Sequence, residues 1–205
     1  MHISEGVLSA PVLVSGGVLA AGGVAMGLRR MDYDRIPQVG VLSSAFFVAS
    51  LIHIPIGPSS VHLILNGLLG VILGWAAVPA ILVGLFLQAV LFHHGGLSTL
   101  GVNTVTMAFP AVLCHYLFRN AIQMRHAGGA AVAGFLAGAL PIALAGAMML
   151  ASLVLSAEAL REPAWVVFYW HVPVMVIEGL ITASVVGFLR RVRPELLKAP
   201  VLEAK

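Results

Sequence analysis

The first two residues, Met1 and His2, place three nitrogen atoms on one short stretch of backbone. These are the α-amine of Met1, the amide nitrogen of His2 and the imidazole of His2, which can close fused chelate rings around one metal ion. Planar nitrogen donors suit Ni²⁺ or Cu²⁺ and suit tetrahedral Zn²⁺ poorly. Because His2 is a large residue, we expect the initiator methionine to be kept, with a free amine. A histidine at position two is usually without function, so other residues have to support this chemistry.

A second candidate ligand, His62, closes the segment Gly57-Pro58-Ser59-Ser60-Val61-His62, at the expected start of a helix. Asn66 follows one turn later on the same helix face, where it could support His62. An imidazole that faces a helical bundle there could give a metal ion its fourth nitrogen. A helix-capping or loop-packing role for His62 is equally consistent with the pattern.

A glycine-rich stretch runs from His93 to Thr104 and is too apolar for a simple solvated linker. Its paired glycines permit unusual backbone angles, as in a loop folded back over a site. Asn103 could hydrogen-bond a liganding imidazole or a backbone carbonyl. His93 and His94 cannot both point the same way, so at most one of them faces the interior. Gln88, in the apolar run before the loop, is a further supporting candidate.

The last apolar run carries His171 and Glu178, which are seven residues apart and share a helix face. Ionisable groups inside a membrane are costly and usually functional. Glu178 is therefore expected to have a polar partner. It could help to neutralise a bound cation, but a structural tie between helices is at least as plausible.

The composition identifies a membrane protein. Hydrophobic residues make up 60% of the chain and charged residues 9%, with a mean hydropathy of +1.03. Soluble domains carry about 25% charged residues. Since a helix needs roughly 20 apolar residues to span a bilayer, the chain has room for six or seven spans and no sizeable soluble domain. We expect one transmembrane domain over residues 1–205 and no nucleic-acid binding, because the cations lie in short loops.

The apolar runs predict an all-α, polytopic fold with seven transmembrane helices. Their expected ranges are 8–28, 38–53, 60–76, 77–93, 103–120, 128–155 and 165–189. Lys and Arg accumulate in cytoplasmic loops. With seven spans, ten of the eleven cations fall on one side and only Arg161 on the other. This favours an external N-terminus and a cytoplasmic C-terminus.

Several sequence motifs are absent. The chain has no GxxxxGK[ST] phosphate loop, so we expect no ATP site, and it has no HExxH or GxSxG. The pattern indicates capture of a cation rather than an enzyme. Two rivals stay open at this point. One is a haem-binding membrane electron-transfer subunit that uses His94, His115 or His171, although these lie at different expected depths. The other is a passive cation channel.

Four segments resemble the CbiM/NikM family, the substrate-specific (S) subunits of energy-coupling-factor cobalt and nickel transporters. The opening Met1-His2-Ile3-Ser4-Glu5-Gly6-Val7-Leu8 is similar to the family's MHI-x-[ED]-G-x-L. The other three are Gly57–Leu63, Gln88–Met107 with its Gly-Gly-Leu and Leu-Gly-Val-Asn core, and His171–Gly179. His53 departs from the family's usual pattern before His62 and could support the site or lie at an interface.

The resemblance implies a six-helix core plus an additional N-terminal helix, in a prokaryotic plasma membrane. It implies that the Met1 amine, the His2 amide and imidazole, and the His62 imidazole bind Ni²⁺ or Co²⁺ as transported substrate, with Gln88–Met107 covering the site. It also implies a coupling transmembrane (T) subunit, two ATPase subunits that hydrolyse ATP and, as in many members, a small auxiliary membrane subunit. The family's cobalt transport is linked to cobalamin biosynthesis.

Overall fold

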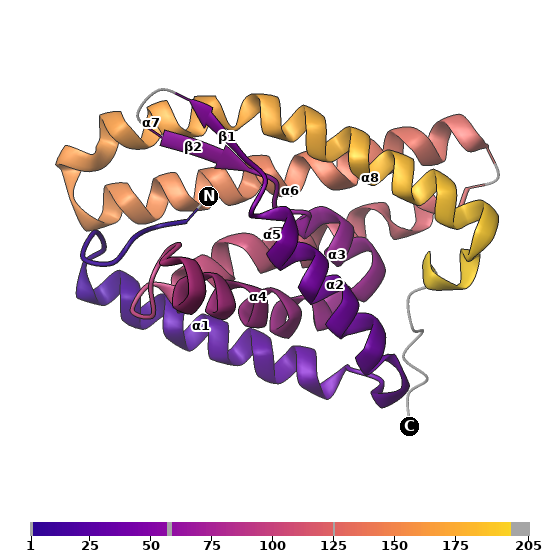
Figure 1. The fold of residues 1–205 in the computed structure, drawn as a ribbon, viewed down its shortest axis with the longest axis horizontal. Helices are drawn as coiled ribbons and strands as arrows, with labels where there is room; N and C mark the ends of the chain where they lie inside the picture. The colour runs from indigo at the N-terminus through magenta and orange to yellow at the C-terminus, as the bar shows by residue number, and fades with distance from the viewer. Residues whose placement is uncertain (1, 57–58, 125, 198–205) are drawn as a thin grey trace.

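The computed structural model describes residues 2–56, 59–124 and 126–197, and within them all side chains except those of 53–61 and 127 (Figure 1). Most of the chain is helical. The helices are α1 (Ala10–Arg29), α2 (Ile36–Ala49), α3 (Asn66–Leu73), α4 (Ala77–Phe92), α5 (Leu100–Ile122), α6 (Ala127–Ser156), α7 (Arg161–Trp170) and α8 (Val172–Val192). Short 3₁₀ turns are η1 (Tyr33–Arg35), η2 (Gly74–Ala76), η3 (Glu158–Leu160) and η4 (Pro194–Leu197).

Five helical stretches within the described residues are long and apolar enough to cross a membrane. They are Ala10–Arg29, Asn66–Phe92, Leu100–Ile122, Gly128–Ser156 and Glu158–Val192. Large apolar side chains such as Val18 and Leu155 are 68% and 76% exposed, as expected for surfaces that contact lipid instead of water. The prediction of a helical membrane protein is confirmed.

The second and third expected spans are shorter than predicted. Helix α2 has 14 residues and α3 has 8, which at 1.5 Å per residue gives about 21 and 12 Å against a hydrocarbon core of about 30 Å. Two antiparallel strands lie between them, β1 (His53–Ile56) and β2 (Ser59–His62), with His53 opposite His62. The expectation that residues 60–62 are helical was therefore wrong.

The reason for this hairpin lies in the residue types. Pro55 lacks the N–H that a helix interior needs, and the isoleucines on either side of it favour extended structure. The Gly57-Pro58 pair lies between the strands. An apolar run interrupted in this way pairs its backbone N–H and C=O groups in a hairpin. His62 therefore lies at the end of a strand and not inside a helix.

The last expected span, 165–189, is divided into α7 and α8 at His171. Pro173 explains the division, since its ring removes a helical donor and crowds the preceding turn. Proline is well tolerated in the first turn of a new helix, which is where α8 carries it.

Small residues bring α3, α6 and α8 into backbone contact. A Cβ atom on Gly67 of α3 would lie 2.2 Å from the Ala137 carbonyl of α6, and one on Gly138 would lie 2.5 Å from the Glu178 carbonyl of α8. Such close approach is typical of membrane helices, because packing rather than hydrophobicity drives their association. It places Glu178 beside the start of α3.

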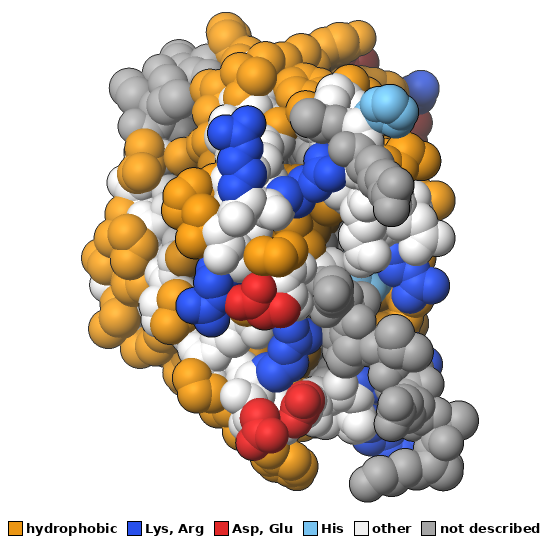
Figure 2. All heavy atoms as spheres, turned by 90° about the vertical axis from the view of Figure 1, so that its right-hand side faces the viewer, with side chains coloured by type: hydrophobic (Ala, Val, Ile, Leu, Met, Phe, Trp, Pro, Cys, Tyr) orange, Lys and Arg blue, Asp and Glu red, His pale blue; other side chains and the backbone are white. Residues whose placement is uncertain are grey.

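Cationic residues gather at the end of the bundle where α1 and α8 end. Figure 2 views this end, where blue side chains outnumber red ones. The described arginines in the last turns of α1, α5 and α8 and in the segments that follow are half-buried or exposed; they are Arg29, Arg30, Arg35, Arg119, Arg190, Arg191 and Arg193. This asymmetry is the one that the positive-inside rule describes.

Candidate metal centre

The segment before α1 is held inside the bundle by side chains of α5 and of the loop that precedes it. Figure 1 shows it running from the start of α1 back between the helices. Ile3 is 4% exposed. Its N–H donates to Asn103 Oδ1 (3.0 Å), and its carbonyl accepts from Asn103 Nδ2 (3.1 Å) and Thr99 Oγ1 (2.8 Å). The Asn103 amide thus bonds both the N–H and the C=O of Ile3, as the backbone of a neighbouring strand would. It fixes the residue that follows His2.

The side chains of His2 and His62 meet. The Nδ1 atom of His2 and the Nε2 atom of His62 are 3.0 Å apart, and the two rings stack with centroids separated by 4.7 Å. His62 is 5% exposed. Residues 60 positions apart in the sequence therefore present two ring nitrogens to one point.

Hydrogen bonds set the direction of both rings. His62 Nδ1 donates to the Leu63 carbonyl (2.9 Å), which can only accept, so Nε2 carries the lone pair. The Gln88 Oε1 atom lies 2.6 Å from His2 Nε2. In this amide orientation His2 Nε2 donates, and its Nδ1 also carries a lone pair. Two nitrogens that both carry lone pairs are then 3.0 Å apart, an arrangement that is stabilised by a shared proton or by a metal ion bound to both.

The loop after α4 lies against the N-terminal segment. A Cβ atom on Gly95 (φ +79°) would lie 2.9 Å from Asn103 Nδ2, and one on Gly96 would lie 1.8 Å from Glu5 Cγ. Glu5 Oε1 accepts the Ser98 N–H (3.1 Å). Any larger residue at Gly95 or Gly96 would require its neighbours to shift.

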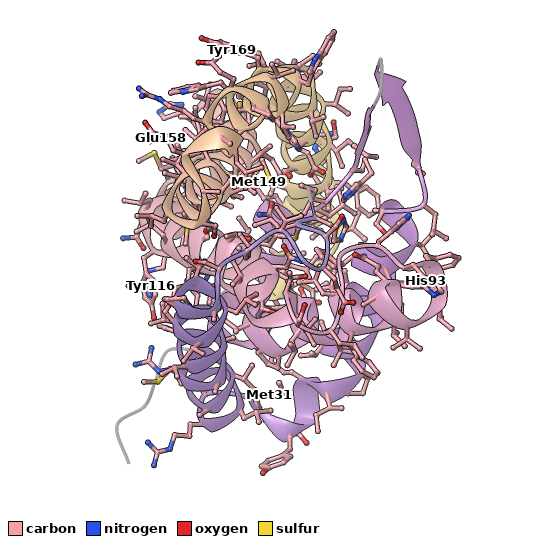
Figure 3. The ribbon with its side chains drawn as sticks, turned by 90° about the vertical axis from the view of Figure 1, so that its left-hand side faces the viewer. Met31, His93, Tyr116, Met149, Glu158 and Tyr169 are labelled. Atoms are coloured by element: carbon pink, nitrogen blue, oxygen red, sulfur yellow. The ribbon has the colours of Figure 1, made fainter. Side chains whose placement is uncertain are left out.

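The same loop distinguishes His93 from His94. The His94 ring lies 5.9 Å from that of His2, measured between centroids. His93 has a left-handed backbone (φ 57°) and is exposed at the rim of the molecule, as Figure 3 shows. Sequence reasoning did not place His94 beside His2, because the direction of each side chain depends on the backbone angle at His93.

Glu178 supports the His62 side of the site. Its fully buried carboxylate accepts the N–H of Ile64 and, at 2.9 and 3.0 Å, that of Leu65. Leu65 has a φ of 58°, which is costly for a leucine. Helix α3 begins at the next residue without a side-chain cap of its own. Glu178 therefore caps α3 from another helix and fixes the turn after His62, which favours the structural tie over direct contact with a cation.

The remaining supporting candidates have other contacts. Asn66 Nδ2 donates to the Met107 carbonyl (3.0 Å) and so joins α3 to α5. His171 Nδ1 donates to the Val167 carbonyl (2.7 Å) at the break between α7 and α8. The backbone of His53 lies opposite His62 in the hairpin, whereas its side chain and the whole of Met1 lie outside the described residues.

The described part of the chain contains no group of three or more His, Cys, Asp and Glu side chains that could hold a metal ion. A metal centre at His2 and His62 must therefore take its other ligands from elsewhere. Backbone and terminal nitrogens next to His2 are the nearest source in the sequence.

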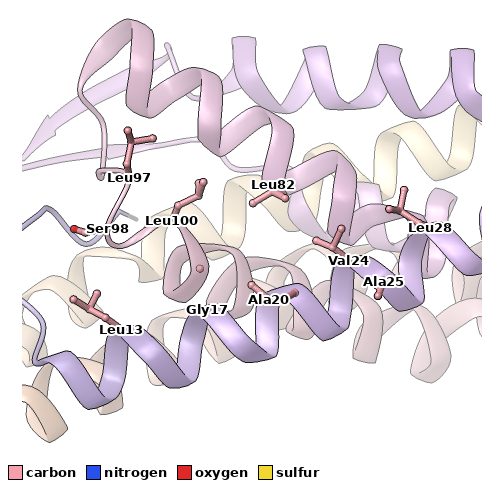
Figure 4. A pocket seen from close by; sticks show the side chains of 12 residues that line it. Leu13, Gly17, Ala20, Val24, Ala25, Leu28, Leu82, Leu97, Ser98 and Leu100 are labelled. Carbon is pink, nitrogen blue, oxygen red and sulfur yellow. The ribbon is translucent and has the colours of Figure 1, made fainter.

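A separate groove of about 560 Å³ runs between α1, α4 and the start of α5 (Figure 4). Leu13, Val24 and Leu28 line one side, and Leu82 and Leu97 line the other. It is open and mostly apolar, and neither His2 nor His62 lines it. This groove lacks the donors that a metal ion needs, so the histidine pair remains the candidate site.

Comparison with known proteins identifies the family of the chain. Residues 2–196 match the family model described as the cobalt uptake substrate-specific transmembrane region, CbiM. The chain belongs to the CbiM family. CbiM proteins are substrate-specific membrane components of cobalt and nickel transport, and the chain is thus a multi-pass protein of a prokaryotic plasma membrane. Family membership disfavours the haem and channel alternatives.

Individual relatives of this CbiM chain extend over nearly all of it. It is 44% identical to a putative metal transport protein of Haemophilus influenzae. The 201 aligned residues cover 96% of this chain and 97% of the relative. It is 33% identical over 228 residues to a fused nickel transport protein, NikMN, of Rhodobacter capsulatus, covering 96% of this chain and 64% of the relative. A crystal structure of a transition metal transporter superposes with a TM-score of 0.78 at 25% identity, over 94% of this chain and 93% of that one.

Proposed function

We propose that the chain captures Ni²⁺ or Co²⁺ with four nitrogens: the Met1 amine, the His2 amide, His2 Nδ1 and His62 Nε2. The contact between His2 and His62 carries this proposal. Nitrogens about 2.0 Å from a first-row metal ion are about 2.8 Å apart when they occupy neighbouring corners of a square. The two ring nitrogens are 3.0 Å apart, so a metal ion can bind both with little movement.

The other two nitrogens come from the backbone next to His2. A chelate through an amine, an amide nitrogen and a ring nitrogen requires that the first two lose protons, so binding releases protons to the solvent. Asn103, Thr99 and Gln88 hold this segment before the metal arrives, and Glu178 holds the turn after His62. Pre-organised ligands of this kind reduce the cost of ordering the site.

We further propose seven membrane-crossing segments, with the N-terminus outside and the C-terminus in the cytoplasm. The short pair α2 and α3 would supply the second and third segments, and α7 with α8 the seventh. The arginine-rich end supports this orientation. A cysteine introduced at Tyr33, which is 84% exposed, should react with a membrane-impermeant maleimide only in inside-out vesicles, in a Cys114→Ala background.

Transport also needs partners. We propose that a coupling transmembrane subunit and two ATPase subunits drive release of the metal to the cytoplasm, and that a small auxiliary membrane subunit can join them. Support comes from the fused relative in Rhodobacter capsulatus, of which this chain covers 64%. Co-purification of tagged chain with the products of neighbouring genes would test this composition.

The decisive experiment blocks the amine. One extra residue before Met1, or acetylation of its amine, removes a nitrogen donor and should abolish binding of one Ni²⁺ or Co²⁺ per chain, as should His62→Ala. The control is His126→Ala, which changes an exposed histidine at the start of α6. Metal analysis of the purified protein gives the stoichiometry. Unchanged binding after blocking the amine would refute the four-nitrogen site.

A further inference from the structure

Two arginines and two aromatic residues meet at the surface, on segments other than those that carry the histidine pair. Tyr116 of α5 is at the centre, and we call these four residues the Tyr116 cluster. The Tyr116 hydroxyl accepts from Arg30 Nη1 and from Trp75 Nε1, both at 3.0 Å. The Arg30 guanidinium lies 5.4 Å from the Trp75 ring centroid, and the Arg119 guanidinium lies 5.3 Å from that of Tyr116. Three segments, the end of α1, η2 and the end of α5, thus build one constellation.

The Tyr116 cluster holds two positive charges beside one phenol ring. Within the described residues the ion pair of the structure is Arg193 with Glu195, which does not involve this cluster. The hydroxyl that Arg30 contacts is neutral, and a guanidinium has five N–H donors in a planar fork that suits phosphate. The charge and the donors of the cluster therefore match an anionic, oxygen-rich ligand.

The position of the cluster indicates where that ligand comes from. Figure 3 shows Tyr116 at the rim of the molecule, and its side chain is 43% exposed. Leu113 and Leu117 lie on the same face of α5 and are 49% and 55% exposed, and Leu28, at the end of α1, is 55% exposed. Tryptophan and tyrosine are enriched where a membrane meets water. The cluster thus combines a cationic head at the interface with an apolar surface directed into the bilayer.

We propose that the Tyr116 cluster binds the phosphate of an anionic phospholipid, whose acyl chains lie along the exposed leucines of α1 and α5. Under the orientation proposed above, this lipid belongs to the inner leaflet. Basic sites between helices on the cytoplasmic side are known to suit acidic headgroups. The proposal depends on the membrane location of the chain and not on the metal site, so either can fail without the other.

The test uses native mass spectrometry of the purified full-length chain with phosphatidylglycerol or phosphatidylcholine of the same acyl chains. The wild type should retain phosphatidylglycerol preferentially. Arg30→Gln and Arg119→Gln should each weaken this retention about fivefold, and the double variant should lose the preference. Tyr116→Phe, which removes the shared acceptor, should weaken it less. Arg191→Gln makes the same charge change at an exposed arginine of α8 and should leave retention unchanged.

Three outcomes would overturn the proposal. In the first, the double variant retains phosphatidylglycerol as well as Arg191→Gln does. In the second, inorganic phosphate at equal concentration displaces the lipid and raises the melting temperature by the same amount, which would indicate an anion site only. In the third, lipid retention is unchanged but the variants no longer bind a partner subunit, which would assign the cluster to an acidic protein surface. Unchanged Co²⁺ binding by the double variant would show that the fold is intact.

Discussion

The two imidazoles of the candidate metal centre are delivered by segments that are held in different ways. His2 belongs to an irregular segment whose neighbour Ile3 is bound by amide and hydroxyl side chains of Asn103 and Thr99. His62 ends a strand, and the turn after it is bound by the carboxylate of Glu178. Asn103 and Thr99 hold the N-terminal segment against the loop before α5, whereas Glu178 also caps α3 and joins it to α8. Changes to Asn103 and Thr99 should therefore affect mainly metal binding, whereas changes to Glu178 should affect metal binding and stability together.

The largest effect on metal binding is expected for the side chain that holds Ile3, next to His2. Asn103→Leu removes both bonds to Ile3 and leaves its buried N–H without this acceptor. Changes to groups that orient metal ligands cost 10–100-fold in affinity, and we expect about 100-fold here, with little change in melting temperature. Calorimetric titration with Ni²⁺ and a thermal melt measure the two quantities.

The control for Asn103→Leu is Asn120→Ala, at an exposed position on the same helix. It should leave both quantities unchanged. A large fall in melting temperature with Asn103→Leu would show that the N-terminal segment is part of the folding core, and the contrast between Asn103 and Glu178 would disappear.

Glu178→Gln should affect binding less and stability more. A glutamine oxygen in the Oε1 position still accepts both backbone N–H groups, but the NH₂ group then takes the place of Oε2 and faces the Leu65 N–H. A buried donor without an acceptor costs about 1–3 kcal/mol, and this cost falls on the start of α3 as well as on His62. We expect about tenfold weaker Ni²⁺ binding together with a lower melting temperature. Weaker binding at an unchanged melting temperature would contradict the capping role.

Gln88 tests the direction of the His2 ring. Gln88→Leu removes the acceptor at His2 Nε2 and should weaken binding about tenfold, the lower end of the range for such partners. Gln88→Glu keeps an acceptor there and should bind within a few-fold of the wild type. Ni²⁺ affinity can be measured by competition with a coloured chelator. Equal losses of affinity in the two variants would show that this hydrogen bond does not orient the His2 ring.

The smallest effect is expected in the covering loop. Gly96→Ala would place a Cβ atom 1.8 Å from Glu5 Cγ, so Glu5 would have to release the Ser98 N–H. The loss of one partly exposed bond of this kind is about 1 kcal/mol, or about fivefold in affinity. Gly22→Ala on α1, where a Cβ meets open space, is the matched control. If Gly22→Ala weakens Ni²⁺ binding as much as Gly96→Ala does, the contact between the loop and Glu5 does not contribute to binding.

The sequence by itself determined the membrane class, the positions of most helices and the two histidines that meet. These are local properties: hydropathy over about 20 residues identifies a span, and the chelate proposed for Met1 and His2 uses nitrogens of two adjacent residues. Even so, residues up to His53 and from Ser60 on were predicted to be helical, because hydropathy alone does not distinguish a short apolar strand from a helix.

The tertiary structure decided how the site is held. Asn103 binds a backbone 100 positions away, Glu178 binds one 114 positions away, and Gln88 reaches His2 across 86. No local pattern contains such pairings, since each depends on how the helices pack. The close approach of α3, α6 and α8 at Gly67 and Gly138 brings Glu178 to the His62 turn. The physical reason is that a buried polar group must find a partner wherever the fold places one.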